Sequence, residues 1–312
     1  MKTIFLPIFT GAILWMAPVN AFSKTIVVTT TTTLAGFVEE IGGQHVSVDS
    51  FTFGPQDPHF VEAKPSFMLK ARKADLLVAV GLNLEIGWLP NIIVGSRNPR
   101  IAFGSKGYFE TGQLIEPMQV PTQKVDRAMG DIHGFGNPHF MLDPTRAQKV
   151  ARGIANKLSE LDPLHASYFT KRAEKLIHSI DLQVPQWQQR IQKTGITHIV
   201  TYHQTLFYFI NRFGLTHVAS IEPKPGIPPS AKHIHGLIKI IAEKKPVCMM
   251  IESFFESNSA EKIQNQTGTH FEVVATEINA TQNTASYIKL IESLVTAIER
   301  CAKDTYPERK LQ

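Results

Sequence analysis

The chain has 312 residues, of which 43% are hydrophobic and 19% are charged, and its formal net charge at pH 7 is +5. The 32 lysines and arginines are scattered along the sequence, so the positive charge gives no argument for a nucleic-acid partner.

The first residues have the composition of a signal peptide for export. A lysine at position 2 precedes the apolar run Ile4–Val19, which Pro7 and Pro18 interrupt, and Val19-Asn20-Ala21 is a small-x-small cleavage site. No cysteine stands directly after this site, so we expect no lipid anchor of the bacterial lipoprotein type, and no later stretch approaches the roughly 20 apolar residues of a membrane helix. We therefore expect residues 1–21 to be removed. The mature protein, about 290 residues long, would be periplasmic, with no stable membrane insertion and room for one large or two medium domains.

Strand and helix patterns alternate in the first half of the chain. The apolar run Asp75–Val80 is typical of a buried parallel strand, and Gly42-Gly43 ends a helix. This alternation predicts βα units and a mostly parallel sheet, followed by a long irregular loop over residues 104–138. The predicted strands are Thr25–Thr30, Val46–Phe53, Asp75–Val80 and Arg100–Phe103, and the predicted helices are Leu34–Ile41, Pro65–Lys73 and Glu85–Val94.

A helix-rich stretch, Pro144–Lys193, divides this half from a second half of the same style. Its longer part, Pro163–Lys193, would extend about 45 Å at roughly 1.5 Å per residue, so we expect it to span two lobes, with a kink at Pro185. The later predicted strands are Thr197–Tyr202, Thr216–Ile221, Val247–Ile251 and Phe271–Ala275, and the helices are Gln204–Phe213, Ala231–Lys244, Asn258–Thr267 and Thr284–Ala302. The predicted fold class is α/β, with two mostly parallel-sheet lobes (residues 22–160 and 195–312) joined by one long rigid helix (residues 161–194).

Two similar turns each carry a histidine between proline and phenylalanine. They are Asp57-Pro58-His59-Phe60 and Asn137-Pro138-His139-Phe140, and Asp143-Pro144 supplies a helix N-cap and N1 residue directly after the second. A single turn of this kind would usually be a solvent-exposed histidine. Two histidines on rigid turns suggest a shared role, and binding a metal ion is the commonest such role.

Two further candidate ligands directly follow predicted strands. His203 comes after Thr197–Tyr202, and Glu277 comes after Phe271–Ala275. Ligands of open α/β sheets bind in a cleft beyond the carboxyl ends of the strands. The side chains of His203, Glu277 and His59 should therefore face such a cleft. Three neutral imidazoles and one carboxylate form a complete tetrahedral set for a zinc-like ion and leave no open position for a reacting water. The pattern therefore predicts binding and no enzyme activity.

Each of these residues also has a simpler interpretation. His203 could be a core histidine at a strand end, and Glu277 taken alone could be a solvated loop carboxylate. His133, six residues before His139, is a possible substitute ligand. The only two cysteines, Cys248 and Cys301, form a candidate disulfide in an exported chain, with two buried free thiols as the alternative.

The chain resembles the zinc/manganese solute-binding proteins of bacterial ABC importers, the ZnuA/TroA type, over essentially the whole mature sequence. The similar segments are Asp57-Pro58-His59 with Pro65-Ser66, Ala74-Asp75-Leu76, Gly81-Leu82-Asn83-Leu84-Glu85 and Trp88-Leu89; Gly136-Asn137-Pro138-His139 with Leu142-Asp143-Pro144; Tyr202-His203 with Tyr208-Phe209 and Phe213-Gly214-Leu215; and Pro225-Gly226 with Pro229-Ser230.

This resemblance implies two α/β lobes bridged by a rigid helix, with the metal between them. It implies His59, His139 and His203 as ligands, Zn²⁺ or alternatively Mn²⁺ as the transported ion, and a membrane ABC permease as the partner of a monomeric protein. Zinc is favoured because imidazoles outnumber oxygen ligands, whereas manganese prefers more oxygens. It also implies the link between Cys248 and Cys301 that similar zinc binders often have.

The sequence departs from the family pattern in three places. The fourth ligand is usually Asp, whereas Glu277 fills that position here. The His- and Asp-rich loop of many zinc binders is missing, since residues 104–138 hold one histidine, and Pro185 is unusual in the linker helix.

Two rival functions are an exported zinc hydrolase and a binding module for a metal chelate or a host surface ligand. A hydrolase would need an open coordination site and a general base. The one obvious spare carboxylate, Glu252, fits better as a hydrogen-bond acceptor for a ligating imidazole. A binding module for an organic ligand would need an aromatic-rich cleft and would not need three convergent histidines.

Overall fold

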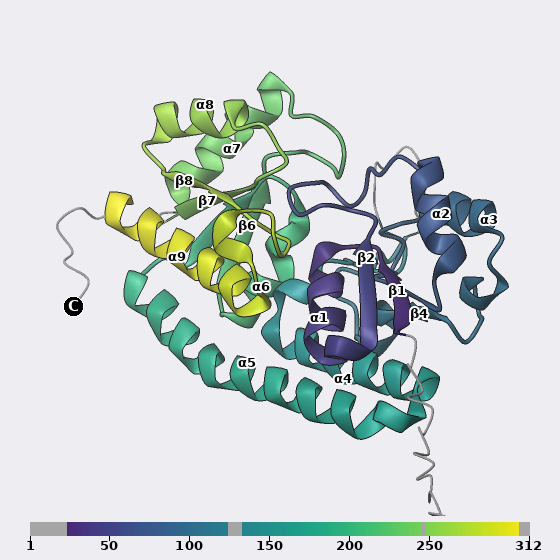
Figure 1. Ribbon diagram of the computed structural model, residues 1–312. Coiled ribbons are helices and arrows are strands. Elements are labelled where there is room, and N and C mark those ends of the chain that lie inside the picture. The colour runs from purple at the N-terminus through teal and green to yellow at the C-terminus, as the bar shows by residue number, and fades with distance from the viewer. Residues whose placement is uncertain (1–23, 124–132, 245–246, 306–312) are drawn as a thin grey trace, which may run out of the picture.

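The computed structural model describes residues 24–123, 133–244 and 247–305, and these form two four-stranded parallel sheets (Figure 1). The first sheet has the order β2-β1-β3-β4 and the second has the order β6-β5-β7-β8, so the first strand of each lobe, β1 or β5, is an interior strand of its sheet. This confirms the predicted fold class. The strands are β1 Thr25–Thr29, β2 Val46–Ser50, β3 Leu76–Ala79, β4 Tyr108–Glu110, β5 His198–Thr201, β6 Thr216–Ser220, β7 Val247–Glu252 and β8 Phe271–Val274.

Helices cover the sheets, and one long helix runs along both lobes. Helix α5, Ala166–Thr194, has 29 residues and remains one helix although Pro185 lies inside it. It contacts α1 of the first lobe and α9 of the second, as Figure 1 shows. The predicted lobe-spanning helix is therefore present, although Pro163–His165 is a separate 3₁₀ turn before it. The other helices are α1 Thr32–Gly42, α2 Pro65–Lys73, α3 Leu89–Ser96, α4 Pro144–Leu161, α6 Phe207–Arg212, α7 Ala231–Glu243, α8 Asn258–Thr267 and α9 Tyr287–Thr305.

One hydrophobic core passes from lobe to lobe through α5. Phe169 near its start, Ile180 at its middle and Trp187 in its second half are all fully buried and belong to the same apolar cluster. Burial of such large side chains contributes about 2 kcal/mol each, so the helix is held along most of its length. Among the described helices, none has the length and apolar character of a membrane span.

The fourth strand of the first sheet is not where the sequence predicted it. Pro99–Ile101 is a 3₁₀ turn, capped by the Asn98 side chain, which accepts a hydrogen bond from the Arg100 backbone at 3.1 Å. The strand is β4, within the predicted irregular loop. Gly107 makes it possible, because a Cβ there would lie 2.3 Å from the Asp75 carbonyl oxygen. Part of that predicted loop, residues 124–132, lies outside the described residues, as does the predicted signal peptide.

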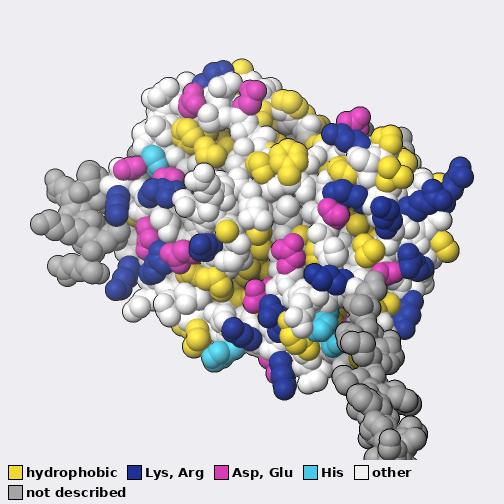
Figure 2. All heavy atoms as spheres, viewed as in Figure 1, with side chains coloured by type: hydrophobic (Ala, Val, Ile, Leu, Met, Phe, Trp, Pro, Cys, Tyr) yellow, Lys and Arg dark blue, Asp and Glu magenta, His cyan; other side chains and the backbone are white. Residues whose placement is uncertain are grey.

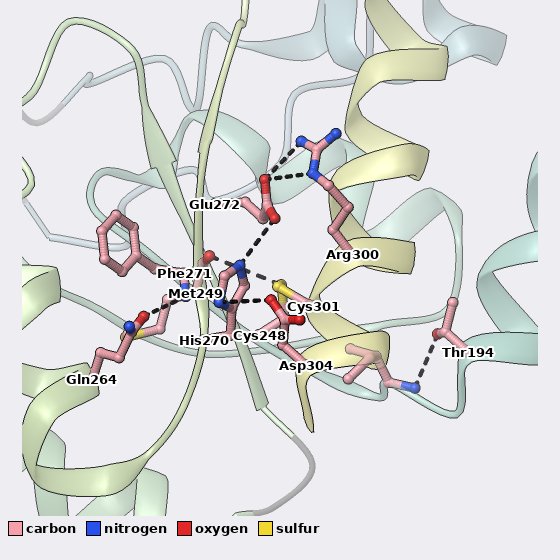
Figure 3. Close-up of a disulfide and its surroundings, with 11 residues drawn as sticks. Thr194, Cys248, Met249, Gln264, His270, Phe271, Glu272, Arg300, Cys301 and Asp304 are labelled. Carbon is pink, nitrogen blue, oxygen red and sulfur yellow. Dashed lines mark hydrogen bonds and ion pairs between the residues drawn. A yellow bond between two sulfur atoms is a disulfide. The ribbon is translucent and has the colours of Figure 1, made fainter. Parts of the chain in front are cut away.

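A disulfide between Cys248 and Cys301 fastens α9 to strand β7 (Figure 3). Both residues are fully buried, and the pairing confirms the sequence prediction. Beside it, His270 lies between Glu272 and Asp304, with nitrogen–oxygen distances of 3.0 and 3.1 Å. The bond closes a segment of 53 positions, which anchors the last helix to the sheet that carries His203.

A buried carboxyl group, Glu85, organises the carboxyl ends of β1 and β3. Its Oε1 accepts hydrogen bonds from the Thr30 hydroxyl at 2.6 Å and the Val80 backbone N–H at 2.8 Å, and its Oε2 accepts from Gly81 N–H at 3.0 Å. Burial outweighs these bonds and raises the pKa of Glu85 to about 7. The folded protein thus holds a proton that the unfolded chain, with an ordinary pKa of 4.5, releases between pH 4.5 and 7.

Glu85→Gln should therefore change how stability depends on pH. Since the folded-state pKa is raised, the wild-type contribution is full below pH 4.5 and is lost as pH rises through about 7. Relative to Glu85→Gln, wild-type stability should fall by on the order of 3 kcal/mol between pH 4.5 and 8. Urea unfolding of metal-free protein across this range measures the difference. Parallel stability curves would contradict the assignment, and the exposed Glu62→Gln serves as control.

Candidate metal centre

Three histidines from three separate loops meet between the lobes. His59 lies in the loop after β2, His203 directly follows β5, and His139 precedes the short 3₁₀ turn Phe140–Leu142 that leads into α4. The ring centroids are 5.0 Å apart for His59 and His139, 5.1 Å for His59 and His203, and 5.3 Å for His139 and His203. One nitrogen of each ring lies within 4.8 Å of the other two. This nearly equilateral arrangement is compatible with three bonds to one ion.

The turn that carries His139 is fixed by Asn137. Its Oδ1 accepts the His139 backbone N–H at 2.9 Å, and its Nδ2 donates to the carbonyl of Gln204, next to His203, at 3.0 Å. The Tyr208 hydroxyl donates to the Asn137 carbonyl at 2.8 Å. One asparagine thus sets the backbone at His139 and connects it to the loop that presents His203.

The helix start predicted after this turn is also present. Asp143 is the N-cap of α4 and accepts the Thr145 N–H at 2.9 Å, with Pro144 at the first helical position. The carboxylate is fully buried and bonds Arg146 as well as Arg212 of the second lobe, whose Nε lies 2.7 Å from Oδ1. A buried, paired charge of this kind is costly to break, so it holds the His139 turn against α6.

Carboxylates orient two of the three rings from behind. Asp57 Oδ1 lies 2.6 Å from Nδ1 of His59, and Glu222 is hydrogen-bonded to Nδ1 of His203. An acceptor at Nδ1 fixes the proton on that nitrogen and leaves Nε2 with its lone pair for a metal. Asp57 and Glu222 therefore have the positions that carboxylates take behind metal-binding histidines in metalloproteins.

The carboxylate behind His203 is not the one expected from the sequence. Glu252 Oε2 accepts the His203 backbone N–H at 3.4 Å, whereas Glu222 bonds the ring. Glu222 follows strand β6 as His203 follows β5, so the sequence contained the same positional signal for it. Burial raises the pKa of Glu252, which is fully buried, to about 7.

The protonation preferences of the rings differ. Burial, followed by the nearby His59 and His203, holds the pKa of His139 well below its usual range. Burial also acts to lower the pKa of His203, but the hydrogen bond and charge of Glu222 outweigh it and raise the pKa. His139 is thus neutral at pH 7, and its buried Nε2 has no hydrogen-bond partner among the described residues. A buried nitrogen with a free lone pair, facing two other imidazoles, has the position of a metal ligand.

His133 also belongs to this cleft. Its Nε2 lies 3.1 Å from Nε2 of His59, and their ring centroids are 5.2 Å apart. With His139, His203 and Gln204, it lines a cavity of about 130 Å³. Burial and the neighbouring imidazoles lower the pKa of His133 to about 3, so it too is neutral at pH 7. His133 thus lines the same cavity as two of the three histidines.

Glu277 lies at the cleft but outside the group of three imidazoles. It lines a cavity of about 20 Å³ together with His139. Its Oε2 accepts the Thr33 backbone N–H at 2.9 Å, at the start of α1 in the opposite lobe. Burial raises the pKa of Glu277 although the bonds to Thr33 act to lower it. The carboxylate is therefore at the lobe interface, where it connects the loop after β8 to a helix N-terminus.

Comparisons with known proteins agree with this architecture. Residues 27–301 match the family model described as zinc-uptake complex component A, periplasmic. The chain is 25% identical to iron-binding protein YfeA of Yersinia pestis over 269 residues, which cover 85% of this chain and 81% of that protein. It is 22% identical to the manganese ABC transporter substrate-binding lipoprotein PsaA of Streptococcus pneumoniae over 249 residues, covering 78% and 77%.

The fold is shared with a solved structure. The crystal structure of ZnuA superposes with a TM-score of 0.73 at 22% identity and covers 90% of this chain and 99% of that chain. Because the family model spans most of the sequence, the chain belongs to the ZnuA family of metal-binding components of ABC transporters.

Proposed function

We propose that this protein captures Zn²⁺ in the periplasm and delivers it to the membrane permease of an ABC importer. The observation that carries the proposal is the buried, unpartnered Nε2 of His139 beside His59 and His203. The relatives named above are described as iron- and manganese-binding, so family membership alone does not select the metal. Three imidazole donors favour Zn²⁺ over Mn²⁺ on chemical grounds.

In this proposal His59, His139, His203 and Glu277 bind the ion, with His133 as the alternative fourth ligand. Glu277 supplies a negative charge, which offsets the charge of a divalent cation in a buried site. His133 would add no charge, so the site with its ion would carry +2, but it would give a softer set of donor atoms. Glu277 already accepts a hydrogen bond from Thr33 N–H, so as a ligand it would share its carboxylate between the metal and this N–H group.

We also propose that the protein is a carrier and no enzyme. A full set of four protein ligands leaves no position for a reacting water. Glu252 is fully buried against the His203 backbone, and so is not placed as a general base in the cleft. In this account residues 1–21 direct export, residues 22–160 and 195–312 are the two lobes around residues 161–194, and the mature chain acts as a monomer.

Competition between the two ions tests the choice of metal. Metal-free protein is titrated with Zn²⁺ and with Mn²⁺ against one chelator at pH 7.5. It should bind Zn²⁺ on the order of 100-fold more tightly than Mn²⁺ or better, because imidazole nitrogens bind Zn²⁺ more strongly than Mn²⁺. Equal affinities, or tighter binding of Mn²⁺, would contradict the zinc assignment.

A series of variants tests the ligands. His139→Ala should weaken Zn²⁺ binding most, since it removes a ligand from a rigid turn. Glu222→Gln should weaken binding by about 10- to 100-fold, because the ring of His203 loses its orienting carboxylate. The exposed Glu243→Gln in the same lobe should leave affinity unchanged. Isothermal titration or chelator competition measures each constant.

The same series identifies the fourth ligand. Weaker binding in Glu277→Gln with unchanged binding in His133→Ala supports the carboxylate, and the reverse result assigns His133. If His139→Ala keeps wild-type affinity, the cleft is not the metal site.

A further inference from the structure

A second group of possible metal ligands lies on the first lobe, away from the cleft. It consists of His45, Asp162 and His165, and one ligand atom of each lies within 4.8 Å of the other two. His45 ends the 3₁₀ turn Gly43–His45 and directly precedes β2, whereas His59 follows the other end of that strand. Asp162 directly precedes the 3₁₀ turn between α4 and α5, and His165 is the last residue of that turn. The group is thus at the amino ends of the strands, whereas the cleft lies beyond their carboxyl ends.

The side chains are already assembled. His165 Nδ1 lies 2.6 Å from Asp162 Oδ2, and the rings of His45 and His165 are stacked with centroids 3.7 Å apart and planes 26° from parallel. All three side chains are partly buried, so the group is reachable from solvent. Figure 2 shows exposed histidine side chains over the region that α1 and α5 occupy in Figure 1.

The surrounding packing fixes the two turns against each other. Tyr168 meets the His45 ring edge-on at 4.7 Å. Gly43 has φ +50° and ψ −128°, a backbone conformation that residues with a Cβ rarely adopt, and a Cβ there would lie 2.3 Å from the Tyr168 hydroxyl. His45 is therefore held beside His165 although 120 positions separate them in the sequence (165 − 45).

The chemistry of the group is that of a borderline divalent cation site. An imidazole ligand offers one ring nitrogen, and in this group one ligand atom of each residue already lies within 4.8 Å of the other two. Two imidazoles and a carboxylate are a common partial set for zinc, with bonds of about 2.0–2.1 Å. The two rings would have to tilt away from their stacked arrangement, because each imidazole binds an ion through a lone pair in its own ring plane and both planes must meet at the ion.

We propose that His45, Asp162 and His165 form a second, weaker binding site for Zn²⁺ or another late first-row divalent cation, with water completing the coordination. A bound ion would join the α1–β2 turn to the α4–α5 turn. Binding at this site is independent of the cleft and of transport, because one group lies at the amino ends of the strands of the first sheet and the other at their carboxyl ends.

Counting Zn²⁺ equivalents in the metal-free mature chain tests this site. Wild type should show one tight and one weaker equivalent by isothermal titration. His165→Ala should lose only the weaker one, and Asp162→Asn should weaken it about tenfold or more. His139→Ala should lose the tight one and keep the weaker. His178→Ala, which changes an exposed histidine on α5, should keep both.

Ring NMR signals of wild-type protein give a readout that needs no variant. The imidazole resonances of His45 and His165 should shift only as the second equivalent is added. A single equivalent in wild type, a weaker equivalent that survives in His165→Ala, or shifts confined to the cleft histidines would each overturn the second site. If the tight equivalent survives in His139→Ala while His165→Ala still loses the weaker one, the cleft assignment fails and the second site stands.

Discussion

The backbone at His139 depends on hydrogen bonds that cross between the lobes. Asn137 connects the His139 turn to the carbonyl beside His203, and Asp143, four residues after His139, pairs with Arg212 of the second lobe. The three imidazoles therefore converge because loops far apart in sequence are fixed to each other before any ion binds. A rigid site of this kind loses little conformational entropy on binding.

Electrostatics complement this rigidity. Asp57 and Glu222 lie behind two of the rings, while His139 is buried and neutral with an open Nε2. A cation in the cleft would relieve the unpaired nitrogen and would gain from both carboxylates without direct contact. The long helix α5 and the shared hydrophobic core keep the two halves of this environment together.

Much of this architecture could be predicted from the sequence, because it follows local rules. The alternation of strands and helices predicted both sheets, and the Pro-His turns and His203 lie together as expected. Strand β4 was missed because Gly107 permits a close backbone approach that no local pattern reveals. The choice of Glu222 over Glu252 depends on which carboxylate reaches a ring in three dimensions, and the bond from Thr33 to Glu277 joins residues at opposite ends of the chain. Such long-range contacts are set by packing.

The coordination of zinc by the cleft histidines is the central claim, and X-ray absorption at the zinc edge tests it most directly. Protein loaded with one equivalent of Zn²⁺ should show nitrogen and oxygen neighbours at about 2.0–2.1 Å, with scattering from at least three imidazole rings. The same measurement on His139→Ala should show one imidazole fewer. A shell of six oxygens, or fewer than two imidazoles in the wild-type protein, would contradict the account.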